Sequence, residues 1–398
     1  MSKKNVKEVV ILGASFAGLQ VASDLAGTVD LKVTVVDPLQ YWEFTPSIHT
    51  LLGGARSDGE TLLTPLNEKL VGKDVSFITG RAMALDEEGN ISVLINQSIQ
   101  KIRYDYLVIA TGCGYATPIR PVESKLESRL SSISKCKKKV ADSTSILIVG
   151  GGAVGVEMAA ELAWCGKKVT LATNAHELLL DCPSQTREKA QTWLLTHGVD
   201  IFFQTKVQEH AVNTFKLIRG NGADAVTTIS QFDSCFWCIG GKPRTEFLAN
   251  SLIVKLDPRG FVQIDQATRQ AAPGIYAIGD VAAKSDAQRL ASYAHLEGEF
   301  VARAILKHAK SGQLSTDQYI APPRFVALSL GPRDGAFIYD SYHISMFPGR
   351  LVPILKMVIE AWFIRLLPMP YAILKLLPGD VAARFWCKKS KAPSPAVA

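Results

Sequence analysis

The sequence predicts an α/β protein with two parallel sheets, each begun by a strand–helix–strand unit, and a small α+β region at the C-terminal end. Two stretches, residues 8–37 and 145–173, each show an apolar run, a glycine-rich turn, a helical pattern and a second apolar run. This order is typical of a βαβ unit. A third apolar run, residues 275–278, leads into Gly279-Asp280, and a helical pattern follows over residues 291–307.

The first unit carries a dinucleotide-binding fingerprint. Residues 9–12 form an uninterrupted apolar run, as expected for a parallel strand that is buried on both faces. In the turn that follows, the first glycine allows a tight bend, the last lets helix and strand pack closely, and N–H groups at the helix start hold a pyrophosphate. The second strand ends in an acid that would accept hydrogen bonds from an adenosine ribose. The residues expected to bind are Gly13, Ser15, Phe16, Ala17, Gly18 and Asp37.

Ser15 is the one departure from this fingerprint, because a glycine is usual at the middle position. The serine side chain is small, so a pyrophosphate can still approach the backbone. A tight turn without a ligand is the alternative.

Length and composition set the limits of the interpretation. A chain of 398 residues can form two or three domains, each with its own core. The seven cysteines are scattered and odd in number, so we expect no disulfide framework and a reducing, cytoplasmic location. The first strand begins by residue 8, so we expect no signal peptide, and no metal-ligand pattern is apparent. The net charge of +7 could attract nucleic acid, anionic membrane or anionic cofactors.

Residues 41–54 are rich in aromatic and turn residues and contain no cysteine. Their position after the first unit places them near the group that the nucleotide carries. Because the stretch has no cysteine, a redox cysteine pair is excluded at this position. Ordinary core packing of the aromatic residues and contact with the cofactor both stay open, and Pro46 is counted among the cofactor-binding candidates.

A buried strand over residues 106–109 runs into Ala110, Thr111 and Gly112, which form a suitable crossover between domains. Residues 118–144 then become polar and rich in lysine, which indicates a solvated surface. We expect no nucleic-acid site there, because no aromatic residues are interleaved with the lysines.

The second unit has glycines at all three fingerprint positions. Thr173 stands where an acid would hold the 2′-hydroxyl of NADH, so the choice between NADH and NADPH stays open. Glu157 falls in the first turns of the helix, where it could meet the nicotinamide, lie beside a flavin, or interact only with the helix dipole. The residues expected to bind the second nucleotide are Gly150, Gly152, Ala153, Val154, Gly155, Glu157 and Gly240.

Cys235 and Cys238 form a Cys-x-x-Cys sequence that invites a redox or metal interpretation. If the stretch is a strand, residues three apart point to opposite faces and the sulfurs cannot meet. Two separate buried thiols are therefore the favoured interpretation.

Asp280, at the end of the third apolar run, could accept hydrogen bonds from the ribityl hydroxyls of a flavin. The helix that follows could direct its N-terminal dipole at the pyrimidine edge of the flavin ring. A Gly-Asp turn is common on its own, but it becomes a specific sign of a flavin site when it follows two fingerprints and the Ala-Thr-Gly crossover.

The order of these motifs over residues 8–330 resembles the two-dinucleotide-domain flavoproteins. These include type II NADH dehydrogenases, apoptosis-inducing factors and pyridine nucleotide-disulfide oxidoreductases. Within them the chain is most similar to the apoptosis-inducing-factor 2 group, also called ferroptosis suppressor proteins, through residues 45–54 and 329–335 and the missing redox cysteines. It departs from that group in lacking the myristoylation glycine and in having a longer, more apolar tail.

The resemblance implies a glutathione-reductase-like fold with three parts. These are an FAD-binding domain of residues 1–118 and 258–325, an NAD(P)H-binding domain of residues 119–257, and a C-terminal region of residues 326–398. It implies that FAD takes a hydride from NADH or NADPH and passes two electrons to a membrane quinone. Lys356 matches a lysine near the flavin in that group, and Glu157 and Lys356 are the catalytic candidates.

The tail, residues 350–386, contains apolar clusters broken by prolines and charges, too short to span a membrane. Short amphipathic helices with tryptophans and basic residues suit a membrane surface, where a quinone would be met. We expect a cytoplasmic protein peripheral on a membrane of unknown organelle. Packing on the flavin domain and a homodimer contact are the alternatives.

The predicted function is therefore that of an FAD-dependent NAD(P)H:quinone oxidoreductase. One alternative is a sulfide:quinone oxidoreductase, which needs a cysteine pair beside the flavin. Another is a redox-sensing flavoprotein that forms a stable charge-transfer complex with NAD(P)H and acts through a partner or through salt-dependent DNA binding.

Overall fold

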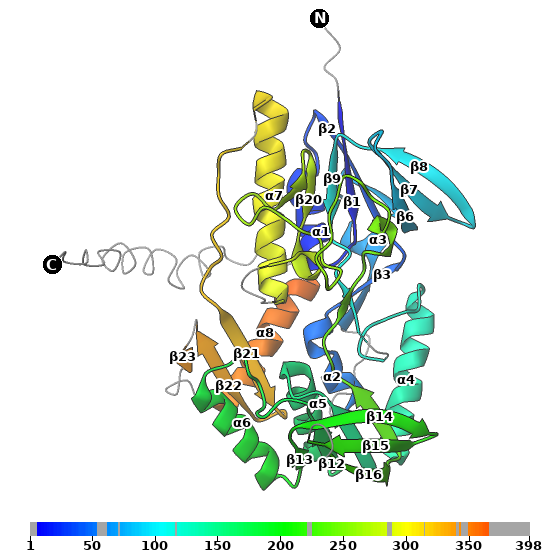
Figure 1. The fold of residues 1–398 in the computed structure, drawn as a ribbon. Coiled ribbons are helices and arrows are strands. Elements are labelled where there is room, and N and C mark those ends of the chain that lie inside the picture. The colour runs from blue at the N-terminus through cyan, green and yellow to red at the C-terminus, as the bar shows by residue number, and fades with distance from the viewer. Residues whose placement is uncertain are drawn as a thin grey trace, which may run out of the picture.

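A computed structural model describes residues 6–53, 62–70, 72–115, 118–220, 225–284, 289–313, 315–339, 342–343 and 349–365. Figure 1 shows one sheet at each end of the molecule, with the C-terminal strands and helix α8 beside the junction between them. The first sheet is parallel except for its edge strand, residues 270–272, and the second is wholly parallel. The strands of the first sheet come from both the N-terminal part of the chain and residues 270–277, whereas those of the second come from residues 145–237. The domain limits given above stay our proposal.

The first sheet has the strand order β19-β20-β9-β1-β2-β5. Its central strand β1 pairs in parallel with both β2 and β9, and residues 9–12 are at most 1% exposed, as the apolar run predicts. The strands are β1 (Lys7–Leu12), β2 (Leu31–Asp37), β5 (Ser76–Thr79), β9 (Tyr106–Ile109), β19 (Gln270–Ala272) and β20 (Ile275–Ala277).

Two helices, α1 (Phe16–Leu25) and α7 (Ala291–Ser311), lie side by side against this sheet (Figure 1). Their close approach requires Gly298, because a Cβ atom there would lie 2.6 Å from the carbonyl oxygen of Ala17. On the opposite face of the first sheet, a three-stranded antiparallel sheet packs against the side chains of its strands. Its strands are β6 (Arg81–Leu85), β7 (Asn90–Ile95) and β8 (Ser98–Arg103).

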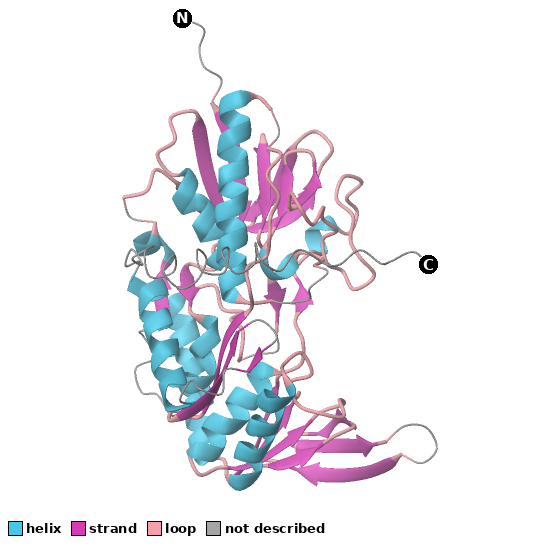
Figure 2. Ribbon diagram, turned by 90° about the vertical axis from the view of Figure 1, so that its left-hand side faces the viewer, coloured by secondary structure: helices cyan, strands magenta, loops and turns pink. Residues whose placement is uncertain are grey.

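The second sheet has the order β13-β12-β11-β17, with all pairings parallel. Figure 2 shows an antiparallel sheet, β14-β15-β16, extending away from the helices at this end of the molecule. The parallel strands are β11 (Ser145–Val149), β12 (Lys168–Ala172), β13 (Asp200–Phe202) and β17 (Ser234–Trp237). The antiparallel strands are β14 (Thr205–Ala211), β15 (Thr214–Arg219) and β16 (Val226–Gln231), and the helices are α5 (Ala153–Trp164) and α6 (Ser184–Thr196).

The polar segment before the second unit contains helix α4 (Leu126–Asp142), although its composition predicts only a solvated surface. Three residues of this helix, Arg129, Ile133 and Val140, are buried, and most of its lysines are exposed. The segment is therefore an amphipathic helix with a narrow buried face.

Short elements complete the junction between the two sheets. β10 (Cys113–Gly114) pairs antiparallel with β18 (Lys242–Pro243). The two segments in which the chain passes between the first and the second sheet therefore lie side by side. The hydroxyl of Thr111 donates to the carbonyl of Arg244 at 2.8 Å, which fixes this crossing. The other short elements are β3 (Tyr41–Glu43), α2 (Ile48–Leu52), β4 (Leu63–Pro65) and α3 (Leu66–Lys69).

The C-terminal region is a small α+β unit, as expected. β21 (Phe325–Leu330), β22 (Asp334–Tyr339) and β23 (Tyr342–His343) form an antiparallel sheet, and α8 (Val352–Arg365) packs against β21 and β22. Within the described residues, every helix is too short or too polar to cross a membrane. Most of the predicted membrane-surface tail, from residue 366 on, lies outside the described residues.

Candidate active site

A cavity of about 650 Å³ lies where the first unit, the second unit and α8 meet. Most of the residues predicted from the sequence line its wall, although they come from seven separate parts of the chain. These residues are Gly13, Ser15, Phe16, Ala17, Asp37, Pro46, Ala110, Thr111, Gly112, Ala153, Val154, Glu157, Gly279, Asp280 and Lys356. The predicted residues that are not on this wall are Gly18, Gly150, Gly152, Gly155 and Gly240.

The first turn has the geometry that the fingerprint requires. Gly13 has φ +108°, and a Cβ atom there would lie 2.3 Å from the carbonyl oxygen of Ala110. A Cβ atom on Gly18 would lie 1.8 Å from the carbonyl oxygen of Gly13, so only glycine fits. These glycines bring the start of α1 close to the ends of β1 and β9.

Asp37 is fixed at the end of β2 by two backbone donors. The N–H of Ala14 donates to Oδ2 at 2.6 Å, and the N–H of Leu39 donates to Oδ1 at 2.7 Å. Burial raises the pKa of Asp37, although both hydrogen bonds oppose this shift. The carboxylate stands on the cavity wall beside the fingerprint turn, where a ribose would be met.

The Gly279-Asp280 turn is held by a buried ion cluster that sequence reasoning missed. The N–H of Gly279 donates to Oε2 of Glu297 on α7 at 2.6 Å. The other oxygen of Glu297 lies 2.9 Å from Nζ of Lys284 and 3.5 Å from Arg269. The side chain of Glu297 is 1% exposed, so these cations compensate its charge inside the protein.

Arginines are the second feature of this wall that the sequence did not reveal. Arg120 lies 3.6 Å from Oδ2 of Asp280, and Arg289 donates to the carbonyl oxygen of Asp280 at 3.2 Å. Arg81 and Arg244 line the same cavity. The guanidinium groups suit a diphosphate, but they are scattered in sequence and converge only through the fold.

The second turn is also built as its fingerprint predicts. Gly150 has φ +122°, and a Cβ atom on Gly155 would lie 1.9 Å from the carbonyl oxygen of Gly150. A Cβ atom on Gly152 would have nothing within 4 Å, and the same is true of Gly240 beyond β17. The space above the second turn is therefore open to the phosphates of a nucleotide.

A buried polar cluster, made by Glu157, Lys356, Ser329 and His49, closes one side of the cavity. Nζ of Lys356 donates to Oε1 of Glu157 at 2.6 Å. The hydroxyl and the N–H of Ser329 donate to the same oxygen at 2.8 and 2.9 Å. The two catalytic candidates, Glu157 and Lys356, thus form one ion pair. The sequence did not predict the other two members of the cluster, Ser329 and His49.

The electrostatics of this cluster favour one charge pattern. Burial raises the pKa of Glu157, but the charge of Lys356 and the hydrogen bonds from Lys356 and Ser329 outweigh it and lower the pKa overall. Burial, followed by the charge of Lys356, lowers the pKa of His49 to about 3. His49 is therefore neutral at pH 7, and its contact of 3.9 Å with Glu157 is not an ion pair.

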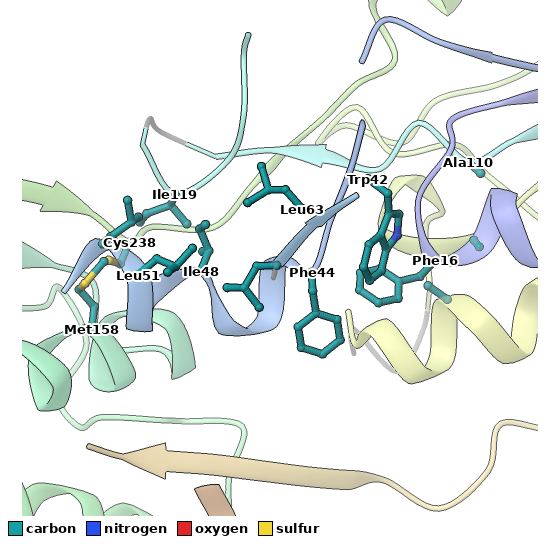
Figure 3. Close-up of a cluster of buried hydrophobic side chains, with 14 of the residues drawn as sticks. Phe16, Trp42, Phe44, Ile48, Leu51, Leu63, Ala110, Ile119, Met158 and Cys238 are labelled. Atoms are coloured by element: carbon teal, nitrogen blue, oxygen red, sulfur yellow. The ribbon is translucent and has the colours of Figure 1, made fainter. Parts of the chain in front are cut away.

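Aromatic side chains form an apolar wall next to the polar cluster. Figure 3 shows Phe16, Trp42 and Phe44 together, beside a continuous row of apolar residues toward Met158 and Cys238. Phe363 of α8 joins them, with ring centroids 5.1 Å from Phe16 and 5.8 Å from Phe44. These aromatic residues are thus both core residues and part of the cavity wall.

All six cysteines that the structure describes are free thiols. Cys238 belongs to the core cluster on the helix side of the second sheet, whereas Cys235 packs against the cluster on its other side. Burial raises the pKa of both thiols. Cys113 lines the cavity, and burial raises its pKa to about 11. The described residues contain no group of three or more metal-ligating side chains.

A family model for pyridine nucleotide-disulphide oxidoreductases matches residues 7–298. The chain belongs to this family. FAD and NAD(P)H are the cofactors of these oxidoreductases, so the two fingerprints and the cavity are those of a flavoprotein. The resemblance stated from the motifs is thereby confirmed at the family level.

Relatives match over most of the chain. Oxidoreductase ptaL of Pestalotiopsis fici is 27% identical over 383 residues, covering 91% of this chain and 98% of that protein. Apoptosis-inducing factor homolog A of Dictyostelium discoideum is 24% identical, covering 83% of this chain and 84% of that protein.

Solved structures of low sequence identity share the fold. NDH2 of Plasmodium falciparum, in complex with NADH, has a TM-score of 0.70 at 15% identity, covering 90% of this chain and 95% of its own. The sulfide:quinone oxidoreductase of Aquifex aeolicus has a TM-score of 0.71 at 19% identity, covering 90% of each chain.

Proposed function

We propose that this flavoprotein is an FAD-dependent NAD(P)H:quinone oxidoreductase. The observation that carries the proposal is the cavity itself, where an aromatic wall meets the Glu157–Lys356 ion pair. A quinone is a flat apolar ring with two carbonyl acceptors, and this combination of surfaces matches it.

The residues present fit FAD at the first turn and a nicotinamide nucleotide at the second. Backbone N–H groups at the start of α1, with Asp37, Asp280 and the nearby arginines, would hold FAD. Gly150, Gly152 and Gly155 would hold the second nucleotide. FAD, when bound, supplies the redox chemistry, taking a hydride from the nicotinamide and giving two electrons to the acceptor.

Lys356 and Glu157 would act on the acceptor side. The ammonium group of Lys356 lines the cavity and can donate to a quinone oxygen, where negative charge develops during reduction. Glu157 holds this ammonium group in place, and Ser329 completes the coordination of the carboxylate. A helix position predicts Glu157 and a resemblance predicts Lys356, and the contact of 2.6 Å between Nζ and Oε1 supports a joint role for the two.

Helix α8 also supports contact with a membrane surface. Its inner face, with Val352, Lys356 and Glu360, is buried, whereas its outer face is apolar and exposed. The outer residues, with their exposed fractions, are Ile354 at 55%, Met357 at 62% and Val358 at 60%, and Leu351, just before the helix, is 39% exposed. A helix that lies in the membrane surface would bury such a face in lipid and place the cavity near a membrane quinone.

The cysteines count against sulfide:quinone chemistry in the part of the chain that the structure describes. Cys113 lines the cavity without a second described cysteine there, and the raised pKa keeps it a thiol at neutral pH. A thiol is a poor nucleophile toward sulfide-derived species compared with a thiolate.

Stopped-flow absorbance tests the proposal. The protein is mixed anaerobically with NADH or NADPH and then with a soluble ubiquinone analogue. We expect rapid bleaching of the oxidised-flavin band, followed by its rapid return with quinone. Bleaching into a long-lived species that quinone barely reoxidises would contradict the proposal and favour the redox-sensing alternative.

A further inference from the structure

Glu161 is a second buried carboxyl group behind the polar cluster. It follows Glu157 by four positions on α5, so the two side chains lie on the same helix face one turn apart. Glu161 is 2% exposed, and its Oε2 has no hydrogen-bond partner among the described residues. An unpartnered buried carboxyl oxygen is costly to maintain, so it calls for an explanation.

The surroundings of Glu161 hold a proton on it. Burial first, and then the negative charge of Glu157, raise the pKa of Glu161 to about 7, against a smaller opposing effect of Lys356. Besides Lys356, neutral His49 on α2 faces Glu157, and Cys165, the residue that caps the C-terminal end of α5, lies near Glu161. The end of α2 covers it, since a Cβ atom on Gly53 would lie 3.1 Å from Cβ of Glu161.

The proton balance of quinone reduction requires a donor of this kind. A quinone becomes a hydroquinone by taking up two electrons and two protons. The nicotinamide supplies both electrons but only one proton, as a hydride, so the second proton comes from water through the protein. This step rests on the proposed function.

We propose that Glu161 is the proton reservoir that supplies this second proton through Glu157 and Lys356. Lys356 gives an N–H proton to the reduced quinone oxygen, and an O–H bond forms there. Glu157 passes a proton to Lys356 across their 2.6 Å contact and takes one from Glu161. Solvent then restores the proton on Glu161. Glu161 is therefore a positioning residue that acts through its neighbour.

The variant Glu161→Gln tests this role, because it keeps the shape of the side chain and removes the exchangeable acid. Flavin reoxidation is followed with a ubiquinone analogue, which takes up the proton, and with ferricyanide, which takes up electrons alone. We expect reoxidation by quinone to slow on the order of tenfold or more at about pH 7, with reoxidation by ferricyanide and reduction by NADH unchanged. Glu161→Asp should recover most of the quinone rate.

Cys165→Ala is the matched control, because it changes a side chain at the C-terminal cap of the same helix without removing a carboxylic acid. Equal slowing of quinone and ferricyanide reactions in Glu161→Gln, or an unchanged quinone rate, would overturn the inference. If the wild-type protein reduces no quinone at all, the proposed function fails instead, so the two failures are distinguishable.

A thermal-stability series provides a readout that is independent of activity. Unfolded Glu161 ionises near its ordinary pKa of 4.5, whereas in the folded protein its pKa is about 7. The wild-type protein should therefore lose stability relative to Glu161→Gln as the pH rises from about 5 to about 8. Parallel melting curves of the two proteins across this range would show that Glu161 is not a buried acid.

Discussion

Asp37 and Thr173 occupy the same place in the two nucleotide-binding units. In each unit the N–H of the first fingerprint glycine donates to the carbonyl oxygen of a residue at the end of the second strand. Gly13 donates to Val36 and Gly150 donates to Ala172, both at 2.8 Å, and Asp37 and Thr173 are the next residues along the chain. Asp37 presents a carboxylate there, but the hydroxyl of Thr173 accepts from the N–H of Ala175 at 3.2 Å. The second site therefore has no carboxylate at this strand end to repel a 2′-phosphate.

Thr173→Asp should convert this position into an NADH-selective one. A carboxylate at the strand end would repel the 2′-phosphate of NADPH and accept from the ribose hydroxyls of NADH. We expect the KM for NADPH to rise on the order of tenfold, equivalent to about 1.4 kcal/mol, with little change for NADH. The measurement is steady-state kinetics with both nucleotides, and Thr173→Ser is the control. An equal change for the two nucleotides would contradict this assignment.

Glu297→Gln should loosen FAD without touching the cavity wall. The carboxylate of Glu297 fixes the Gly279 N–H and compensates Lys284 and Arg269, so its loss leaves two buried cations unpaired. We expect the Kd for FAD to rise on the order of tenfold, measured by flavin fluorescence during titration of the apoprotein. Glu299→Gln, a change on the same helix, should leave FAD binding as in the wild type. Equal retention of FAD in both variants would show that the ion cluster does not position the turn.

Local sequence patterns predicted much of this site. The fingerprint glycines, the strand-end Asp37 and the Gly279-Asp280 turn depend on short-range backbone requirements, so they can be recognised without the fold. The opposite orientation of Cys235 and Cys238 also followed from strand geometry alone. Helix α4 was missed because its buried face has few apolar residues.

Contacts between distant residues could not be predicted in the same way. Ser329 and Glu157 are 172 positions apart, and Ser329 and His49 are 280 apart. A serine or histidine in isolation gives no periodic signal, and its role depends on which elements the fold brings together. Lys356 was accessible only through the resemblance to known flavoproteins, and its pairing with Glu157 was not predicted.

Lys356→Met separates the structural and functional roles of the ion pair. Removing the ammonium group leaves Glu157 charged and buried, which should destabilise the protein by about 3 kcal/mol and slow quinone reduction by about a hundredfold. Adding Glu157→Gln removes the unpaired charge, so the double variant should regain most of the stability. Chemical denaturation and stopped-flow reoxidation measure the two effects. Recovery of quinone reduction in the double variant would exclude Lys356 as the donor to the acceptor.

The exposed face of α8 can be tested apart from its buried face. Replacing Ile354, Met357 and Val358 with serine removes apolar area from the outer face and leaves Lys356 and Glu360 inside. If this face lies in lipid, the triple variant should float with anionic vesicles much less than the wild type, because each buried apolar group contributes to membrane binding.

The same triple variant should keep its rate with soluble quinones and lose rate with long-tailed quinones in vesicles. A triple substitution on the exposed face of α6 that leaves Lys189 unchanged is a suitable control for surface changes in general. Unchanged flotation, together with a shift of the protein to a smaller species in solution, would identify the face as a contact between two copies of the chain. That outcome would replace the membrane-surface proposal, while the quinone chemistry inside the cavity would stand on its own test.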